Sequence, residues 1–154
     1  MSKPTIYLAG PVMNLDDGGA GWREDVIENY DDQFQFNNPL GKYNVPAESL
    51  TVVHGTSGDS DHTVGVDEIV TGDKELLRDS DAVLVGYEAV RSIGTPMEVM
   101  WAFERNYPVA IWIRDSTPID ELSPWYQYHA TAMTNSLQMA LSHLDRQVGG
   151  ETDD

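Results

Sequence analysis

The chain has 154 residues, 40% of them hydrophobic, which is enough for one domain with a buried core and excludes a disordered chain. Its net charge of −17 argues against a basic nucleic-acid-binding face, and no apolar run approaches the roughly 20 residues of a membrane span. The absence of cysteine excludes disulfides and thiolate chemistry and suits a cytoplasmic protein.

The acidic residues are dispersed along the chain and do not collect in a tail. Dispersed carboxylates with few lysines predict a surface adapted to high salt, where screening removes self-repulsion. An ordinary acidic protein is the alternative interpretation. Neither interpretation bears on catalysis.

Apolar runs and helical spacings alternate along the chain. This order predicts a parallel sheet of about five strands with helices on both faces. We expect one domain over 1–148 and a frayed acidic tail over 149–154. The predicted strands cover 5–9, 34–36, 82–87 and 108–113, and the predicted helices begin at Trp22, Val66, Pro96 and Met133.

The segment 40–65 has no regular pattern and contains a polar stretch over 55–61. Loops of this length in compact domains are usually functional or disordered. We therefore expect a mobile flap near a site.

Several binding motifs are missing from the sequence. It has no Gly-x-Gly-x-x-Gly fingerprint, no P-loop and no histidine or carboxylate cluster with metal-ligand spacing. We expect neither a cofactor nor a metal.

Glu98 lies where an apolar strand gives way to a helix. Thr95, Pro96 and Glu98 fit a capping box, with Thr95 as N-cap, and that role alone explains the glutamate. The same position also suits catalysis, because a helix N-terminus keeps a carboxylate ionised and the carboxyl edge of a parallel sheet binds ligands. An ionised carboxylate can attack an electrophilic carbon there.

Asp73 falls on an apolar stripe with Val66, Val70 and Leu77. A carboxyl group on a buried stripe acquires a raised pKa, which suits proton transfer. The alternative is a slightly rotated helix that leaves Asp73 exposed. Two carboxyl groups, one ionised and one with a raised pKa, match the requirements of glycosidic cleavage.

Three further residues have both a structural and a functional interpretation. Tyr7 is either core or a hydrogen-bond donor to the nucleophile. Arg23 is either a solvated arginine or, with the start of its helix, an anion-binding residue. Ser92 is either a plain loop serine or a donor to a substrate hydroxyl or phosphate.

The motifs Ile6 to Pro11, Asp73 with 80–85, and Gly94 to Glu98 together resemble the nucleoside 2-deoxyribosyltransferase family over about residues 5–145. The resemblance implies a flavodoxin-like α/β fold without a cofactor.

The resemblance also implies a role for particular residues. Glu98 would be the nucleophile on the anomeric carbon, Asp73 the proton donor to the leaving base, and Tyr7 the residue that orients Glu98. Gly10 and Gly94 would border the substrate. The substrate would be a small molecule, and the protein a homodimer or larger oligomer in which a neighbouring subunit completes the pocket from 126–133, with His129 as a candidate.

One position departs from the transferases. They usually carry an acid six residues before the nucleophile, where this chain has Ser92. Serine there, with Arg23 in the motif Gly21 to Asp25, resembles the related 2'-deoxynucleoside 5'-monophosphate N-glycosidases. An acid would repel a phosphate, whereas a hydroxyl and an arginine would bind it. We expect base exchange, with hydrolysis of a 5'-monophosphate as the alternative. Because capping alone explains Glu98, non-catalytic nucleotide sensing is the alternative of another class.

Overall fold

Five parallel strands form the central sheet of the computed structural model, which describes residues 3–12, 15–43, 49–53 and 63–149. The strand order is β2-β1-β5-β6-β7. Counted along the chain, this is the order 2-1-3-4-5 of flavodoxin-like sheets, which confirms the predicted α/β fold. The strands are β1 (Thr5–Ala9), β2 (Gln35–Asn37), β5 (Ala82–Tyr87), β6 (Val109–Ile113) and β7 (Ala132–Thr134).

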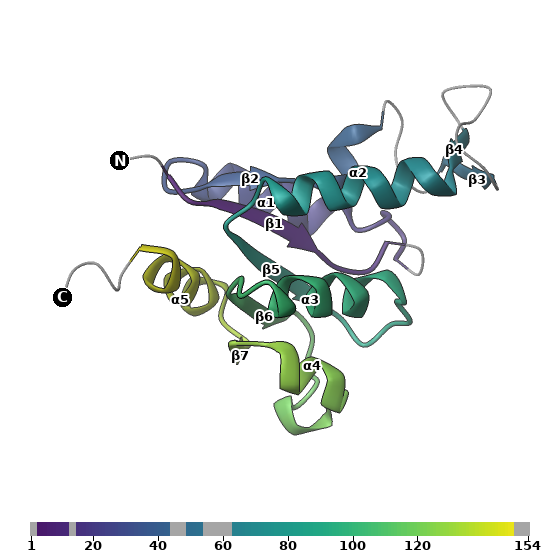
Figure 1. The fold of residues 1–154 in the computed structure, drawn as a ribbon. Coiled ribbons are helices and arrows are strands. Elements are labelled where there is room, and N and C mark those ends of the chain that lie inside the picture. The colour runs from purple at the N-terminus through teal and green to yellow at the C-terminus, as the bar shows by residue number, and fades with distance from the viewer. Residues whose placement is uncertain (1–2, 13–14, 44–48, 54–62, 150–154) are drawn as a thin grey trace.

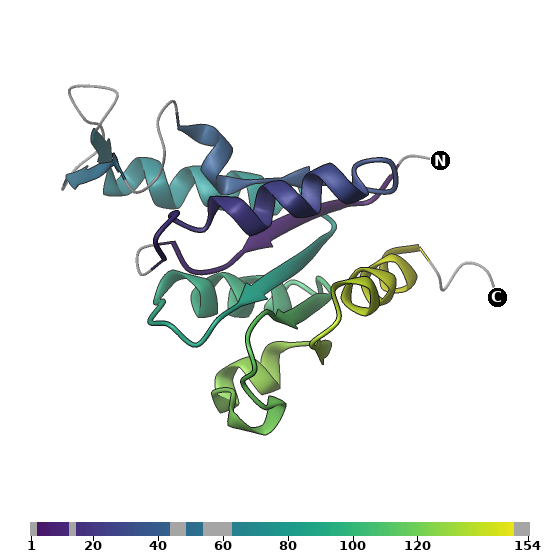
Figure 2. The ribbon, with the colours of Figure 1, turned by 180° about the vertical axis from the view of Figure 1, so that it is seen from behind.

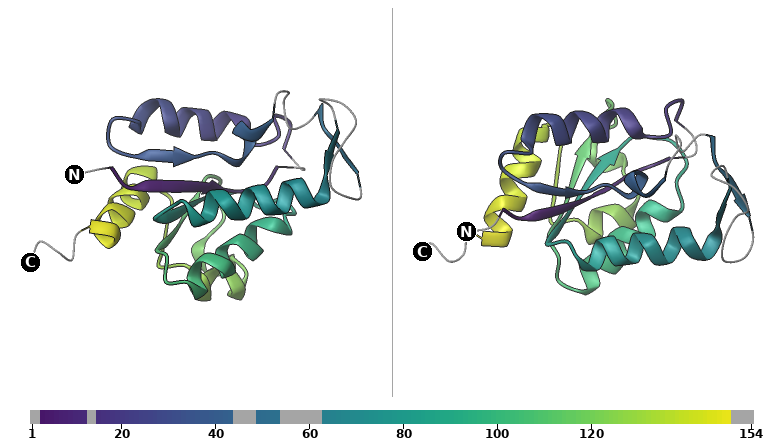
Figure 3. Two further views of the ribbon diagram at one scale, coloured as in Figure 1. Left: turned by 45° about the horizontal axis from the view of Figure 1, so that its top comes forward. Right: turned by 90° about the horizontal axis from the view of Figure 1, so that it is seen from above.

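Helices cover both faces of this sheet (Figures 1 and 3). Helices α1 and α5 pack on one face, while α2, α3 and α4 pack on the other. The view from behind shows α1 and α5 in front of the sheet (Figure 2). The helices are α1 (Ala20–Tyr30), α2 (Val66–Arg78), α3 (Gly94–Glu104), α4 (Pro124–His129) and α5 (Leu137–Gly149).

A hydrophobic core lies on each face of the sheet, and successive residues of a strand contribute to the two cores in alternation. In β1, Ile6 and Leu8 point to the α1/α5 face, whereas Tyr7 and Ala9 point to the α2/α3 face. Because both faces are covered, the three central strands β1, β5 and β6 are nearly continuous hydrophobic runs. Tyr7 is therefore buried, and its side chain is directed to the α2/α3 face.

Trp22 of α1 packs over the carboxyl ends of β1 and β5, and two glycines make room for its ring. A Cβ atom on Gly86 would lie 2.5 Å from the indole ring, and one on Gly10 would lie 3.0 Å from it. The glycines let α1 approach this edge of the sheet closely.

Ordered elements occur inside the segment expected to be irregular. They are the 3-10 helix η1 (Pro39–Lys42) and a small parallel sheet of β3 (Thr51–Val53) and β4 (Thr63–Gly65), which lies at the N-terminal end of α2 (Figure 1). The rest of the expected flap, 44–48 and 54–62, lies outside the described residues.

The prediction was wrong at the C-terminal side in two respects. Met133, expected in the last helix, lies in β7, and that helix begins at Leu137. The short helix α4 and the 3-10 helix η3 (Ile119–Glu121) were not predicted, because segments this short carry too little periodicity. Residues 150–154 of the expected tail lie outside the described residues. Within the described part of the chain, no helix has the length and apolar character to cross a membrane.

Candidate active site

A cavity of about 600 Å³ opens at the carboxyl ends of β1 and β5. Both predicted carboxyl groups, Asp73 and Glu98, line it. This is the edge at which parallel α/β sheets bind ligands. Its other lining residues are Gly10, Val12, Arg23, Pro39, Leu40, Tyr43, Leu50, Val52, Val64, Ile69, Arg91, Ser92, Ile93, Gly94 and Thr95.

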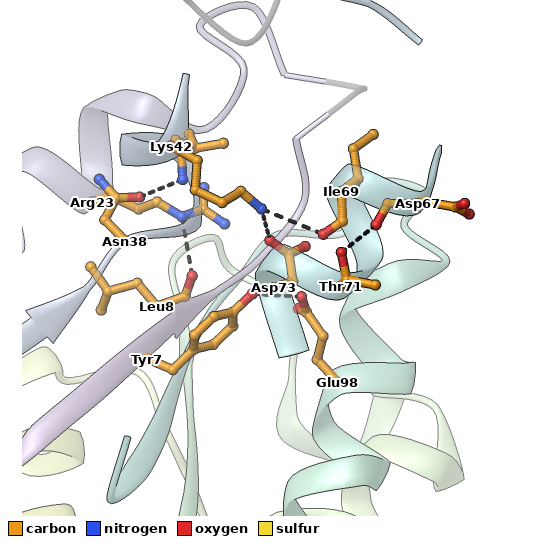
Figure 4. A network of polar contacts seen from close by, with 11 residues as sticks. Tyr7, Leu8, Arg23, Asn38, Lys42, Asp67, Ile69, Thr71, Asp73 and Glu98 are labelled. Atoms are coloured by element: carbon orange, nitrogen blue, oxygen red, sulfur yellow. Dashed lines mark hydrogen bonds and ion pairs between the residues drawn. The ribbon is translucent and has the colours of Figure 1, made fainter. Parts of the chain in front are cut away.

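The Glu98 carboxyl group is held at the floor of the cavity by Tyr7. The Tyr7 hydroxyl donates a hydrogen bond of 2.7 Å to Glu98 Oε2 (Figure 4). Burial, followed by the nearby Glu98 and Asp73 charges, raises the pKa of Tyr7, so that the phenol stays neutral and acts as a donor.

The predicted capping box is absent. Helix α3 begins at Gly94, two residues earlier than expected, with Ile93 as N-cap and no side-chain cap. Thr95 lies inside the first turn, where its hydroxyl pairs with that of Ser92 at 2.7 Å. Glu98 is thus released from capping, and its carboxyl group bonds to Tyr7.

The expectation that the helix N-terminus keeps Glu98 ionised was also wrong. Burial and, after it, the neighbouring Asp73 charge raise the pKa of Glu98 to about 8. The Tyr7 hydrogen bond and the charges of Arg23 and Lys42 oppose this rise in the Glu98 pKa without cancelling it. Desolvation outweighs the helix N-terminus here because the carboxyl group lies a full turn inside α3.

Asp73 faces Glu98 across the cavity from α2 (Figure 4). Burial raises the pKa of Asp73, in the predicted direction, and an ion pair with Lys42 of η1 lowers it. The apolar stripe from which the burial of Asp73 was predicted is only partly buried, since Val66 and Val70 are 38% and 45% exposed. Lys42 of η1 covers the Asp73 carboxyl group at the cavity.

Arg23 lines the cavity but is not solvated. It is 1% exposed, and its guanidinium donates to the carbonyl oxygens of Leu8, Gly10 and Gly19 at 3.2, 3.0 and 2.7 Å. Burial lowers the pKa of Arg23 to about 10, so it keeps its charge at neutral pH. Arg23 ties the end of β1 to the start of α1 and supplies positive charge beneath the two carboxyl groups.

Ser92 and Gly94 line the cavity at the N-terminus of α3, and their binding of substrate stays a prediction. A Cβ atom on Gly94 would meet nothing within 4 Å, so this position is open. Arg91, which was not predicted, also lines this end of the cavity.

His129 lies away from this cavity within the chain. It is 7% exposed, its Nδ1 pairs with the Trp125 carbonyl oxygen at 2.8 Å, and its ring packs against Phe103 and Tyr128. The chain itself does not bring His129 to Glu98, and a contribution from a neighbouring subunit stays a prediction.

Sequence reasoning missed Lys42, Tyr43 and the apolar wall from β3 and β4. A signal for Lys42 was present, because only three lysines occur in a chain with 26 acidic residues. No sequence pattern predicted the apolar wall, because strands of three residues show no reliable alternation of apolar and polar side chains.

The arrangement can perform proton transfer and nucleophilic attack on one bound molecule, because two carboxyl groups with raised pKa share a partly apolar cavity. Among the described residues, no group of three histidine or carboxylate side chains is placed to hold a metal ion.

Comparisons with known proteins bear on the fold. No protein-family model matches the sequence, and no curated protein sequence matches it significantly. A conserved protein of Enterococcus faecalis V583 is similar in structure, with a TM-score of 0.64 and 17% identity over 95% of this chain and 99% of that one. A 2-deoxyribosyltransferase of the psychrotolerant bacterium Bacillus psychrosaccharolyticus gives a TM-score of 0.53 at 15% identity, over 81% of this chain and 90% of that one. At these identities the likeness shows a shared fold.

Proposed function

We propose that the protein is an enzyme that cleaves the N-glycosidic bond of 2'-deoxynucleosides and transfers the sugar to another base. The hydrogen bond of 2.7 Å from Tyr7 to Glu98 carries the proposal, because it places a carboxyl oxygen in a cavity that also holds Asp73. A fold shared with a 2-deoxyribosyltransferase supports it.

In the proposed reaction, a Glu98 oxygen attacks the anomeric carbon C1' as the bond from C1' to the base nitrogen breaks. Asp73 delivers a proton to the departing base. The product is a deoxyribosyl ester of Glu98 and a free base. A second base then attacks C1', the ester bond breaks and regenerates the Glu98 carboxylate, and Asp73 takes up the proton that the incoming base loses.

Tyr7 has two effects in this scheme. Its hydroxyl fixes one carboxyl oxygen of Glu98 and thereby leaves the other directed to the substrate. It also lowers the pKa of Glu98 against the effect of burial, which favours the ionised nucleophile.

Hydrolysis of a 2'-deoxynucleoside 5'-monophosphate is the second candidate, and Ser92 favours it. Ser92 and Arg91 line the cavity at the N-terminus of α3, and neither would repel a phosphate. In this reaction water replaces the second base, and the ester gives free deoxyribose 5-phosphate.

An exchange assay separates these reactions. The protein is incubated with deoxyinosine and free adenine, and separately with each deoxynucleoside 5'-monophosphate alone, at low and at high salt because of the net charge of −17. Formation of deoxyadenosine supports transfer. Release of base from monophosphates alone, without exchange, rejects transfer in favour of hydrolysis. The absence of turnover in every mixture would favour a non-catalytic nucleotide sensor.

We also propose that the protein is a homo-oligomer. Met97 of α3 is 63% exposed, and Trp125 and Tyr128 of α4 are 65% and 71% exposed. The two helices pack side by side, so these apolar side chains lie on neighbouring elements. Sedimentation at several protein concentrations tests the assembly.

A further inference from the structure

The side chain of Lys42 lies across the middle of α2, and a glycine makes room for it. A Cβ atom on Gly72 would be 3.0 Å from Lys42 Cδ and 3.2 Å from its Nζ. Glycine in the middle of a helix is less favourable than alanine. Gly72 therefore gives up helix stability at the point where the lysine crosses.

Lys42 is held at both ends. Its backbone belongs to η1, whose first turn is capped by Asn38, with the side-chain oxygen accepting from Leu40 N at 3.0 Å. Its Nζ donates to Asp73 Oδ1 and, at 3.4 Å, to the Ile69 carbonyl oxygen (Figure 4). The side chains of Lys42 and Asp73 are 21% and 22% exposed, so the pair is largely shielded from solvent.

Charged and titratable groups face Asp73 from several elements. Lys42 contacts it from η1, Arg23 acts on it from α1, and its own charge acts on Glu98 of α3 and on Tyr7 of β1. Tyr43 follows η1, and burial, followed by the Asp73 charge, raises the pKa of its phenol, while the Lys42 charge lowers it. The three carbonyl contacts of Arg23 fix its guanidinium away from a direct bond with Asp73, so Lys42 supplies the cationic contact.

We propose that Lys42 is a positioning residue that fixes Asp73 beside Glu98 and limits this carboxyl pair to one proton. Before substrate binds, the ammonium group keeps Asp73 ionised, and the proton resides on Glu98. Cleavage needs the opposite distribution, with Glu98 ionised and Asp73 protonated. The proton therefore passes from Glu98 to Asp73 once the substrate fills the cavity, and the ion pair with Lys42 loosens as Asp73 becomes neutral.

This inference deepens the proposed function and rests on it for its catalytic consequence. The protonation of the two carboxyl groups before substrate binds does not depend on turnover. The two can therefore be tested separately, and failure of one is distinguishable from failure of the other.

The first test is a carboxyl carbon NMR titration of the empty protein, with the signals of Asp73 and Glu98 assigned through D73N and E98Q. In K42M we expect the Asp73 titration to move to higher pH by about one to three units, the usual effect of losing an opposite charge. K42R restores it in large part. K74M is the matched control, because Lys74 is an exposed lysine of the same helix, and we expect no change there. An Asp73 titration in K42M equal to that of the unaltered protein would overturn the proposal.

G72A tests the position of Lys42 without changing the net charge. The added Cβ atom displaces the lysine, so the Asp73 titration should move in the same direction as in K42M, by a smaller amount. A titration identical to that of the unaltered protein would show that the crossing over Gly72 does not position Asp73.

The second test follows kcat/KM against pH. The acid limb of the profile should move to higher pH in K42M, because the doubly protonated pair then persists to higher pH, and K74M should match the unaltered protein. Turnover with an unmoved acid limb contradicts the inference. If the unaltered protein has no turnover, the proposed function fails, and the NMR titration still decides the role of Lys42.

Discussion

The hydroxyl of Tyr7 and the carboxyl group of Glu98 are 91 residues apart in the chain and 2.7 Å apart in the structure. One is directed from the first strand of the sheet and the other from the first turns of α3. Their contact is possible because β1 and β5 are neighbours in the sheet, so that the helix following β5 starts above the end of β1. The strand order thus builds the site.

Replacing Tyr7 with phenylalanine removes this hydrogen bond and keeps the ring. We expect kcat/KM to fall by about tenfold to a hundredfold, the range for losing a hydrogen bond to a charged group. Y107F is the control, since the Tyr107 hydroxyl bonds to the Arg78 carbonyl oxygen away from the cavity. Steady-state kinetics of both variants decide this. Equal losses in the two would show that the Tyr7 hydroxyl has no particular role.

Stability should depend on pH through Glu98. Its pKa is about 8 in the folded protein against 4.5 ordinarily, so between these values the folded state keeps a proton that the unfolded chain has lost. At low pH the protonated Glu98 therefore adds to the free energy of unfolding, relative to high pH. This contribution is lost as the pH rises from the ordinary pKa of 4.5 to the folded-state pKa of about 8.

Urea unfolding of E98Q measures this effect. The glutamine cannot ionise, so the stability of E98Q relative to the unaltered protein should rise from about pH 5 to about pH 8. E104Q removes an exposed carboxylate from the same helix and should show no comparable trend. If the free energy of unfolding of E98Q and of the unaltered protein changed with pH in the same way, the pKa of Glu98 would not be raised.

The sequence predicted the elements with long apolar runs and the carboxyl pair itself. Thr95 and Glu98 show where local reasoning failed, because the capping motif was plausible locally and the alternative partner, Tyr7, is distant in the chain. The contacts of Arg23 were missed for a related reason. Its three acceptors are main-chain carbonyl oxygens, which leave no mark in the residue types.

Selectivity at the sugar 5' end should depend on Ser92. Changing it to aspartate places a negative charge at the mouth of the cavity, which repels a phosphate more than a hydroxyl. We expect the ratio of kcat/KM for nucleoside over 5'-monophosphate to rise by about tenfold, corresponding to about 1.4 kcal/mol. S116D adds the same charge at an exposed loop position and should leave the ratio unchanged. An unchanged ratio in S92D would remove Ser92 from the 5' subsite.

Gly86 should be intolerant of a side chain. A Cβ atom there would lie 2.5 Å from the Trp22 ring, so G86A must displace α1 or the strand end. We expect a loss of about 1–3 kcal/mol in the free energy of unfolding, as for other overpacked cores. G41A is the control, because a Cβ atom on Gly41 meets nothing within 4 Å. Equal unfolding midpoints in urea for the two variants would contradict the close packing of Trp22 on the sheet.

The covalent role of Glu98 is tested most directly by mass spectrometry of the protein mixed with a deoxynucleoside or its 5'-monophosphate and quenched rapidly in acid. We expect one deoxyribosyl or phosphodeoxyribosyl group on the peptide that contains Glu98, and neither label nor turnover in E98A. Turnover of the same substrate by E98A at the rate of the unaltered protein, or a label on another residue, would contradict it.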